Sequence, residues 1–165
     1  MSNTEHRTPN TEHRTPKTPL PFIYHRRVNF SETDMAGIVH FANYYRWMEE
    51  AEHELFRSVG LSIMEPLPKS AVPAGYLGWP RVSSSLHYES PAHYNDIIVI
   101  GLSIERMGFK SIAYVCEMHR DGRRIAHGRM KTACCHCFAD GTLQSVEIPA
   151  EIRGKLPPPT NFVAE

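Results

Sequence analysis

The strongest secondary-structure signal in the chain is a long amphipathic helix between residues 43 and 60. Its apolar residues recur at the i, i+3, i+4, i+7 spacing of one helix face; they are Tyr44, Trp47, Met48, Ala51, Leu55 and Val59. Asn43 can cap the first turn and Gly60 can end the last one. Because Tyr45 and Phe56 add apolar surface outside this stripe, we expect other structure to surround the helix on most sides.

The segments around this helix have the composition of β-strands. One strand is expected before it, at 23–30, and a Pro- and Gly-rich connection that we predict to be irregular follows it at 61–80. We place the later strands at 81–89, 96–106, 109–120, 123–138 and 142–147. Asp-Gly pairs at 121–122 and 140–141 predict hairpin turns. The order of one strand, a long helix and then antiparallel strands predicts an α+β fold with the helix lying on a curved sheet.

Length favours one domain with a tail at each end. The chain has 165 residues, and single domains commonly hold about 100–150. Near the start, NTEHRTP occurs twice in succession; it has no apolar residue and cannot form a coiled coil. We predict a disordered tail over 1–20, a folded domain over 21–157 that ends in a short helix near 149–156, and a C-terminal tail over 158–165.

The charge balance and the lack of long apolar runs exclude two broad classes. Lys plus Arg and Asp plus Glu both number 18, so the formal net charge is zero. Sequence-independent nucleic-acid binding would need a basic surface. The apolar run Ile97–Ile100 is far too short to cross a bilayer, and the first residues do not have the pattern of a signal peptide. We therefore expect no nucleic-acid partner, no membrane insertion and a cytoplasmic location.

Three of the four cysteines lie in the run Cys134–Cys137, which also contains His136. In an extended strand, Cys135 and Cys137 share one face, while Cys134 and His136 share the other. One face therefore offers only two thiols, and no second Cys pair or suitably spaced His lies nearby, as structural zinc would require. We predict buried, reduced cysteines and no metal site.

The residues from Ser31 to Trp47 have the pattern of a loop that leads into a helix. Asp34 lies in the loop, Gly37 permits a sharp turn, and free N–H groups at the helix start favour negative charge. A carboxylate beside such donors suits acyl transfer, because it can attack an acyl group or activate water while the donors hold the oxyanion. On spacing alone, however, an Asp before a helix is more often a simple cap or turn residue.

The sequence from 28 to 50 reads VNFSETDMAGIVHFANYYRWMEE, and weaker signals are LHYESPAHYND at 86–96 and RRIAHGRMKT at 123–132. This combination resembles the hotdog-fold acyl-CoA thioesterases, in particular the 4-hydroxybenzoyl-CoA thioesterase type, over residues 22–152. The resemblance implies a hotdog fold, in which a curved antiparallel sheet of about five strands wraps a long central helix. It also implies hydrolysis of an acyl-CoA to free acid and coenzyme A, with no further cofactor.

Matched position by position, the resemblance implies roles for single residues. Asp34 matches the catalytic carboxylate, either as nucleophile or as general base, and the backbone N–H of Phe41 matches the donor that polarises the thioester carbonyl. His40 either takes part beside Asp34 or is only bonded to the backbone. The implied substrate-binding residues are Gly37, Ile38, Asn43, Tyr44 and Lys110. Of these, Lys110 matches the last position of a basic cluster for the phosphates of coenzyme A; the neighbouring positions are not basic here.

Several glutamates lie near these residues. We expect Glu32 to be a solvated loop residue, although like-charge repulsion from it could raise the pKa of Asp34. The helix glutamates should mostly form a solvated face, with Glu49 as the reserve catalytic candidate to test after Asp34; they are Glu49, Glu50, Glu52 and Glu54.

The resemblance implies a homodimer or homotetramer with sheets joined edge to edge, which also protects free strand edges. The active site would then lie at the subunit interface. Two other functions stay open. A hotdog enoyl-thioester hydratase or dehydratase generally uses differently placed His and acidic residues. A non-catalytic acyl-CoA-binding module would not require a carboxylate at Asp34, and ligand binding without turnover would favour it.

Overall fold

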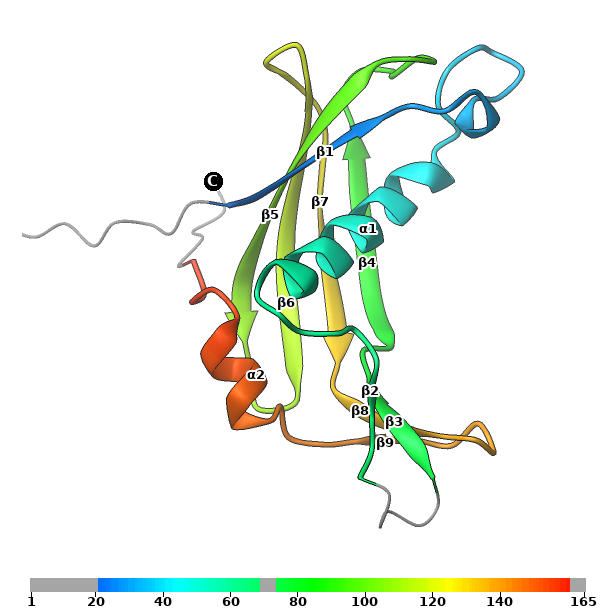
Figure 1. Cartoon of the computed structure of the whole chain (residues 1–165). Helices are drawn as coiled ribbons and strands as arrows, with labels where there is room; N and C mark the ends of the chain where they lie inside the picture. The colour runs from blue at the N-terminus through cyan, green and yellow to red at the C-terminus, as the bar shows by residue number, and fades with distance from the viewer. Residues whose placement is uncertain (1–20, 69–73, 161–165) are drawn as a thin grey trace, which may run out of the picture.

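The computed structural model describes residues 21–68 and 74–160, and its main body is one antiparallel sheet with a long helix across one face (Figure 1). The sheet has the order β1-β5-β6-β7-β4. Its strands are β1 (Phe22–Arg27), β4 (Arg81–Tyr88), β5 (Ile97–Met107), β6 (Ser111–Arg120) and β7 (Arg123–Ala133), and the helix is α1 (Ala42–Ser58). The predicted α+β architecture, with five antiparallel strands and one long helix, is confirmed.

A second, smaller sheet lies beyond the end of the main one. Its order is β2-β3-β8-β9, with β2 (Glu65–Pro66), β3 (Gly75–Gly78), β8 (Cys135–Phe138) and β9 (Leu143–Ser145). The prediction that 61–80 is irregular is therefore wrong for β2 and β3. The single strand predicted over 123–138 is also wrong, because the chain leaves the main sheet at Cys134. There the backbone N–H donates to the carbonyl of Lys110 at 2.8 Å.

The start of α1 differs from the prediction, whereas its end agrees with it. The helix begins at Ala42 with Phe41 at the N-cap position, so the predicted cap at Asn43 is wrong. The Asn43 side-chain amide instead donates to the backbone carbonyl of Glu32 at 2.7 Å. At the other end Gly60 has φ +71° and its N–H donates to the Arg57 carbonyl at 3.0 Å, so the predicted stop is confirmed.

The core lies between α1 and the facing side of the sheet. Trp47, Leu55 and Phe56 of the helix are at most 1% exposed. Alternate residues of β5 and β6 meet them, as the period of two in a strand requires; they are Ile98, Ile100, Leu102, Ile104, Ile112, Tyr114, Cys116 and Met118. The apolar stripe predicted for the helix thus forms the centre of one continuous core.

A short helix, α2 (Ala150–Lys155), lies at one end of the sheet, and its residue Ile152 is buried. The chain then continues to Thr160, which is 3% exposed and donates its N–H to the Ile104 carbonyl at 2.7 Å. The tail predicted over 1–20, with its duplicated NTEHRTP, lies outside the described residues, and so do residues 161–165 of the predicted C-terminal tail.

The carboxylate of Glu52, a residue of α1, is buried. Glu52 is 0% exposed, so the prediction of a solvated residue is wrong there. Its Oε2 lies 2.6 Å from Nη2 of Arg81, within ion-pair distance, but among the described residues neither carboxylate oxygen has a donor in hydrogen-bonding geometry. The hydroxyls of Tyr114 and Thr132 are likewise buried without a hydrogen-bond partner in the part of the chain that the structure describes. Burial raises the pKa of Glu52 to about 7, although the charge of Arg81 acts in the opposite direction.

The four cysteines are all buried free thiols, as predicted. Cys135 and Cys137 share the buried side of β8, whereas His136 between them is half-buried. Within residues 21–68 and 74–160, no group of three or more His, Cys, Asp or Glu side chains is arranged to hold a metal ion. In the same residues, no helix is long and apolar enough to cross a membrane.

Candidate active site

A tight loop between β1 and α1 holds Asp34. The loop closes on itself through a bridge between Thr33 and Val39 and through the N–H of Asp34, which donates to the Ile38 carbonyl at 2.8 Å. Gly37 has φ +74°, which glycine adopts at little cost. The carboxylate of Asp34 accepts the N–H of Ala36 through Oδ1 at 2.8 Å, so one oxygen is held and the side chain stays half-buried.

The backbone then enters α1 beside this carboxylate. The N–H of His40 donates to the Glu32 carbonyl at 2.9 Å, and the N–H of Ala42 meets Nδ1 of His40 at 3.3 Å. Between them, the N–H of Phe41 has no acceptor among the residues that the structure describes. It is therefore available to an oxygen of a ligand, as the first N–H groups of a helix commonly are.

A pocket of about 520 Å³ opens where this loop meets the end of β4. Nine residues line it: Asp34, Ile38, Val39, Phe41, Tyr44, Tyr88, Glu89, Ser90 and Pro91. The structure therefore brings Asp34 together with three other predicted site residues, namely Ile38, Phe41 and Tyr44. A volume of this size is within the range of small-molecule sites in proteins.

Aromatic side chains form one wall of the pocket. The rings of Tyr44 and Tyr88 pack edge to face with centroids 5.2 Å apart. The hydroxyl of Tyr88 donates to the Phe41 carbonyl at 3.3 Å. Burial is the main cause that raises the pKa of Tyr88 to about 12, so this hydroxyl stays protonated at neutral pH. Tyr88 thus links the end of β4 to the start of α1.

The structure does not bring the remaining predicted residues into the lining. Gly37 shapes the loop, the exposed His40 contacts the backbone through Nδ1, and Asn43 bonds the Glu32 carbonyl. Lys110 lies in the turn between β5 and β6, where Nζ donates to the Ser145 carbonyl at 3.2 Å. Figure 1 shows that turn near α2, at the opposite end of the sheet from the loop before α1.

Residues 88–91 were missed as site residues. The sequence LHYESP at 86–91 contributes to the family resemblance, but the sequence alone assigns no role to any of its side chains. Glu89 accepts from Arg124 Nε at 2.8 Å and contacts Nδ1 of His127 at 2.9 Å. Partial desolvation favours a higher pKa for Glu89, but these two partners outweigh it and lower the pKa. Glu89 therefore stays ionised at the rim of the pocket, and Arg124 balances its charge.

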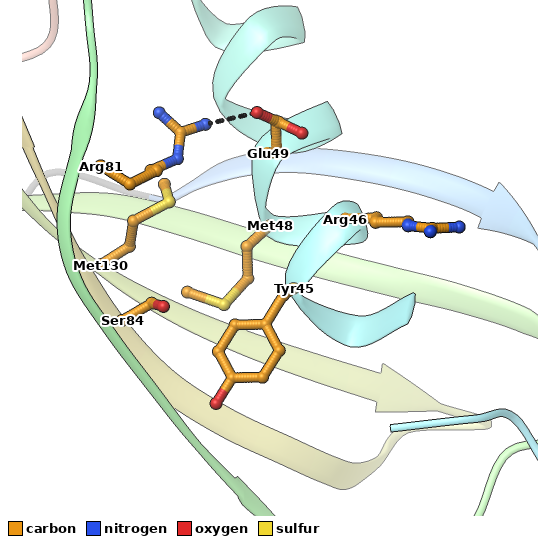
Figure 2. A pocket seen from close by; sticks show the side chains of 7 residues that line it. All are labelled: Tyr45, Arg46, Met48, Glu49, Arg81, Ser84 and Met130. Carbon is orange, nitrogen blue, oxygen red and sulfur yellow. Dashed lines mark hydrogen bonds and ion pairs between the residues drawn. The ribbon is translucent and has the colours of Figure 1, made fainter. Parts of the chain in front are cut away.

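A smaller pocket of about 170 Å³ lies between α1 and β4. Figure 2 shows its lining, which is Tyr45, Arg46, Met48, Glu49, Arg81, Ser84 and Met130. Arg81 Nη2 and Glu49 Oε1 lie 3.3 Å apart and neutralise each other across it. Of the predicted residues this pocket contains only the reserve candidate Glu49, and its lining includes neither Asp34 nor Phe41, so the pocket with Asp34 is the candidate active site.

Comparison with known proteins decides the family. The sequence model of the thioesterase-like superfamily matches residues 28–156, which include the whole loop with Asp34 and both walls of the pocket. The chain belongs to the thioesterase-like superfamily. It is 32% identical over 133 residues to the 4-hydroxybenzoyl-CoA thioesterase of Pseudomonas sp. (strain CBS-3), covering 76% of this chain and 90% of the relative.

Solved structures agree with this assignment. A gentisyl-coenzyme A thioesterase matches with a TM-score of 0.67 and 30% identity, over 82% of this chain and 99% of that one. A 4-hydroxybenzoyl-CoA thioesterase variant in complex with 4-hydroxybenzoyl-CoA matches with a TM-score of 0.71 and 23% identity, over 84% of this chain and 100% of that one. The predicted hotdog fold and the predicted class, an acyl-CoA thioester hydrolase, are confirmed.

Proposed function

We propose that this thioesterase uses the carboxylate of Asp34 to hydrolyse an aryl-CoA thioester, with the N–H of Phe41 polarising the carbonyl. One observation carries the proposal. A half-buried carboxylate and a backbone N–H with no acceptor in the described chain line the same pocket. The helix start stabilises the negative charge that develops on the carbonyl oxygen.

The free oxygen of Asp34 would be the reacting atom, because Oδ1 is held by the Ala36 N–H. In the covalent route, this oxygen bonds to the carbonyl carbon, the C–S bond breaks with the electron pair on sulfur, and water then hydrolyses the mixed anhydride. In the general-base route, the carboxylate takes a proton from water as the water oxygen bonds to that carbon. Both routes give the free acid and coenzyme A, and neither needs a metal or another cofactor.

A hydroxylated aromatic acyl group fits the lining best. The aromatic residues in the pocket lining are Tyr44, Tyr88 and Phe41, and aromatic rings pack well against one another. Two matched relatives are named for 4-hydroxybenzoyl and gentisyl groups, which are both hydroxylated benzoyl groups. We therefore expect higher turnover of hydroxybenzoyl-CoA than of long-chain acyl-CoA.

We also propose that the chain works as a homodimer joined through β4, or as a homotetramer built from two such dimers. This strand is an edge of the main sheet, and seven of its eight residues are exposed. Free edges of this kind readily pair with another strand. Because β4 leads directly to Tyr88 and Glu89, a partner on this edge would lie beside the pocket. Sedimentation velocity at several protein concentrations would test the assembly.

The decisive experiment measures thiol release from short, long and aromatic acyl-CoAs by the wild type and by Asp34→Asn. We expect Asp34→Asn to lose about 10²–10⁴-fold in kcat while it still binds coenzyme A. Asp140→Asn is a matched control, since Oδ1 of Asp140 also accepts an N–H two residues on, from Thr142 at 2.8 Å, in a turn outside the pocket.

The outcomes separate the remaining alternatives. If Asp34→Asn stays within tenfold of the wild type while Asp140→Asn behaves the same way, the role of Asp34 is wrong. If the wild type binds acyl-CoA and releases no thiol from any substrate, the non-catalytic binding module replaces the hydrolase. Consumption of an enoyl-CoA without thiol release would instead favour the hydratase.

A further inference from the structure

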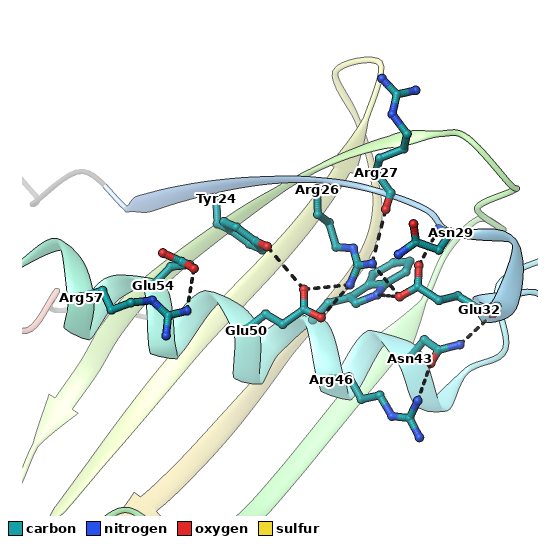
Figure 3. Close-up of polar contacts among 11 residues, drawn as sticks. Tyr24, Arg26, Arg27, Asn29, Glu32, Asn43, Arg46, Glu50, Glu54 and Arg57 are labelled. Carbon is teal, nitrogen blue, oxygen red and sulfur yellow. Dashed lines mark hydrogen bonds and ion pairs between the residues drawn. The ribbon is translucent and has the colours of Figure 1, made fainter. Parts of the chain in front are cut away.

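The side chain of Glu32 joins three separate segments next to the active-site loop. Its Oε1 accepts from Arg26 Nη2 at 2.6 Å and from Trp47 Nε1 at 2.9 Å, while Oε2 accepts the N–H of Asn29 at 2.7 Å. Only 15% of the side chain is exposed, so the prediction of a solvated loop residue is wrong. Figure 3 shows this carboxylate between β1, α1 and the loop.

The backbone carbonyl of Glu32 makes a second set of contacts, toward the helix start. It accepts the N–H of His40 at 2.9 Å and the side-chain amide of Asn43 at 2.7 Å. His40 directly precedes Phe41, and Asp34 lies two residues after Glu32 along the chain. One residue therefore holds both ends of the loop that carries the carboxylate and the N–H donor.

The partners of Glu32 are themselves fixed. The guanidinium of Arg26 lies 4.6 Å from the centroid of the Trp47 ring and is hydrogen-bonded to both carboxylate oxygens of Glu50, at 3.0 and 2.8 Å. The Arg26 side chain is only 7% exposed. Ion pairs in such a site are poorly screened by water, so Glu32 is bound to a rigid part of the fold.

We propose that Glu32 is a positioning residue for the hydrolysis proposed above, on which this inference rests. By binding β1 and α1 with its side chain and the helix entry with its carbonyl, Glu32 sets the distance between the Asp34 carboxylate and the Phe41 N–H. It does not touch the pocket, so it acts only through these two groups. A displacement of about 1 Å in such an arrangement can cost about 100-fold in rate.

The chemistry of the three contacts requires a carboxylate. Arg26, Trp47 and the N–H of Asn29 all donate to Glu32. A glutamine has nearly the same shape but presents one oxygen and one NH₂ group, so at least one of these donors would face another donor. Glu32→Gln should therefore shift the loop without removing packing volume from the core.

The test compares Glu32→Gln with Glu50→Gln in the full-length protein. Glu50 binds the same arginine but makes no hydrogen bond or ion pair with residues 29–41, which makes it a matched control. We expect Glu32→Gln to lower kcat about 10- to 100-fold with KM within about threefold, and Glu50→Gln to leave both within about threefold. Amide hydrogen exchange of His40 is measured in the same variants and should become faster only in Glu32→Gln.

The two measurements separate failure of this inference from failure of the proposed function. If the wild type is active and Glu32→Gln loses no more kcat than Glu50→Gln, the positioning role is wrong. A rise in KM with kcat unchanged would also overturn it, because positioning acts on the chemical step. If the wild type hydrolyses no acyl-CoA, the proposed function fails. The exchange of His40 then decides alone: faster exchange confined to Glu32→Gln supports loop positioning, and unchanged exchange overturns it.

Discussion

Replacing Glu52 with glutamine should stabilise the protein above neutral pH but not in mild acid. The carboxyl is fully buried, and burial raises its pKa from 4.5 to about 7. The folded protein therefore binds this proton more tightly than the unfolded chain does. The resulting contribution to stability is fully present below about pH 4.5 and is lost as the pH rises through about 7.

The structure gives the size of this effect. One pKa unit corresponds to about 1.4 kcal/mol, so a rise from 4.5 to about 7 predicts a loss of about 3 kcal/mol once Glu52 is ionised. A glutamine has nearly the shape of the protonated acid and does not titrate. The difference in unfolding free energy between Glu52→Gln and the wild type should thus grow by about 2–3 kcal/mol between pH 5 and pH 8.5.

Urea unfolding followed by tryptophan fluorescence measures this difference, because Trp47 and Trp79 are both buried. Protein concentration is held constant, since assembly would add to stability. Glu54→Gln is the control: Glu54 lies on the same helix, is only half-buried and binds Arg57 at 2.6 Å. The hydrogen bond from Arg57 lowers the pKa of Glu54, so its substitution should not stabilise the protein at high pH. A constant difference between Glu52→Gln and the wild type across this range would show that the Arg81 ion pair keeps Glu52 ionised throughout and would refute the argument.

Two further predictions concern strand packing and metal dependence. A side chain at Gly128 would collide with the backbone carbonyl of Ser85, so Gly128→Ala should lower the unfolding free energy by about 1–3 kcal/mol in the same urea assay. Gly154→Ala in α2 should not lower it, because none of the described residues would lie within 4 Å of the added carbon. Equal stability of the two variants would contradict the expected clash. Dialysis against a chelator should leave the rate of thiol release unchanged, because the proposed chemistry uses only Asp34 and a backbone N–H; a loss restored by added zinc would contradict this.

The sequence was sufficient for most of the architecture because local patterns dominate there. The helix had clear apolar periodicity, the Asp-Gly turns fix hairpins, and the predicted main-sheet strands agree with the structure within three residues, apart from the segment after residue 133. The break at Cys134 was not predictable, because no local signal marks it. It depends on pairing between β8 and β3, which is a contact between segments far apart in the chain.

The candidate site was predictable where residues are close in sequence. Asp34, Ile38, Phe41 and Tyr44 lie within one short segment, and the structure brings them into one pocket. The opposite wall at residues 88–91 comes from a distant strand and gave no chemical signal.

The burial of Glu32 and Glu52 was not predictable either, because it depends on contacts between segments that local sequence patterns do not connect. Glu32 and Glu52 were expected in solvent because charged residues usually are. Their burial depends on tertiary partners, Arg26 and Arg81, that no spacing rule connects to them.

The two walls of the pocket also differ in what holds them, and this affects how the enzyme could be redesigned for new substrates. The segment after β4 is fixed by its main chain: the N–H groups of Glu89 and Ser90 both donate to the Ile125 carbonyl, at 2.8 and 3.2 Å. Any residue except proline can supply those bonds, so a library at 89 and 90 would change the wall and leave the backbone in place. The side chain of Glu89 also binds Arg124 and His127, but these ion pairs are partly exposed and add little to stability. Tyr88 is different, because its hydroxyl bonds the Phe41 carbonyl beside the active site. Diversity should therefore be concentrated on the two positions that follow it.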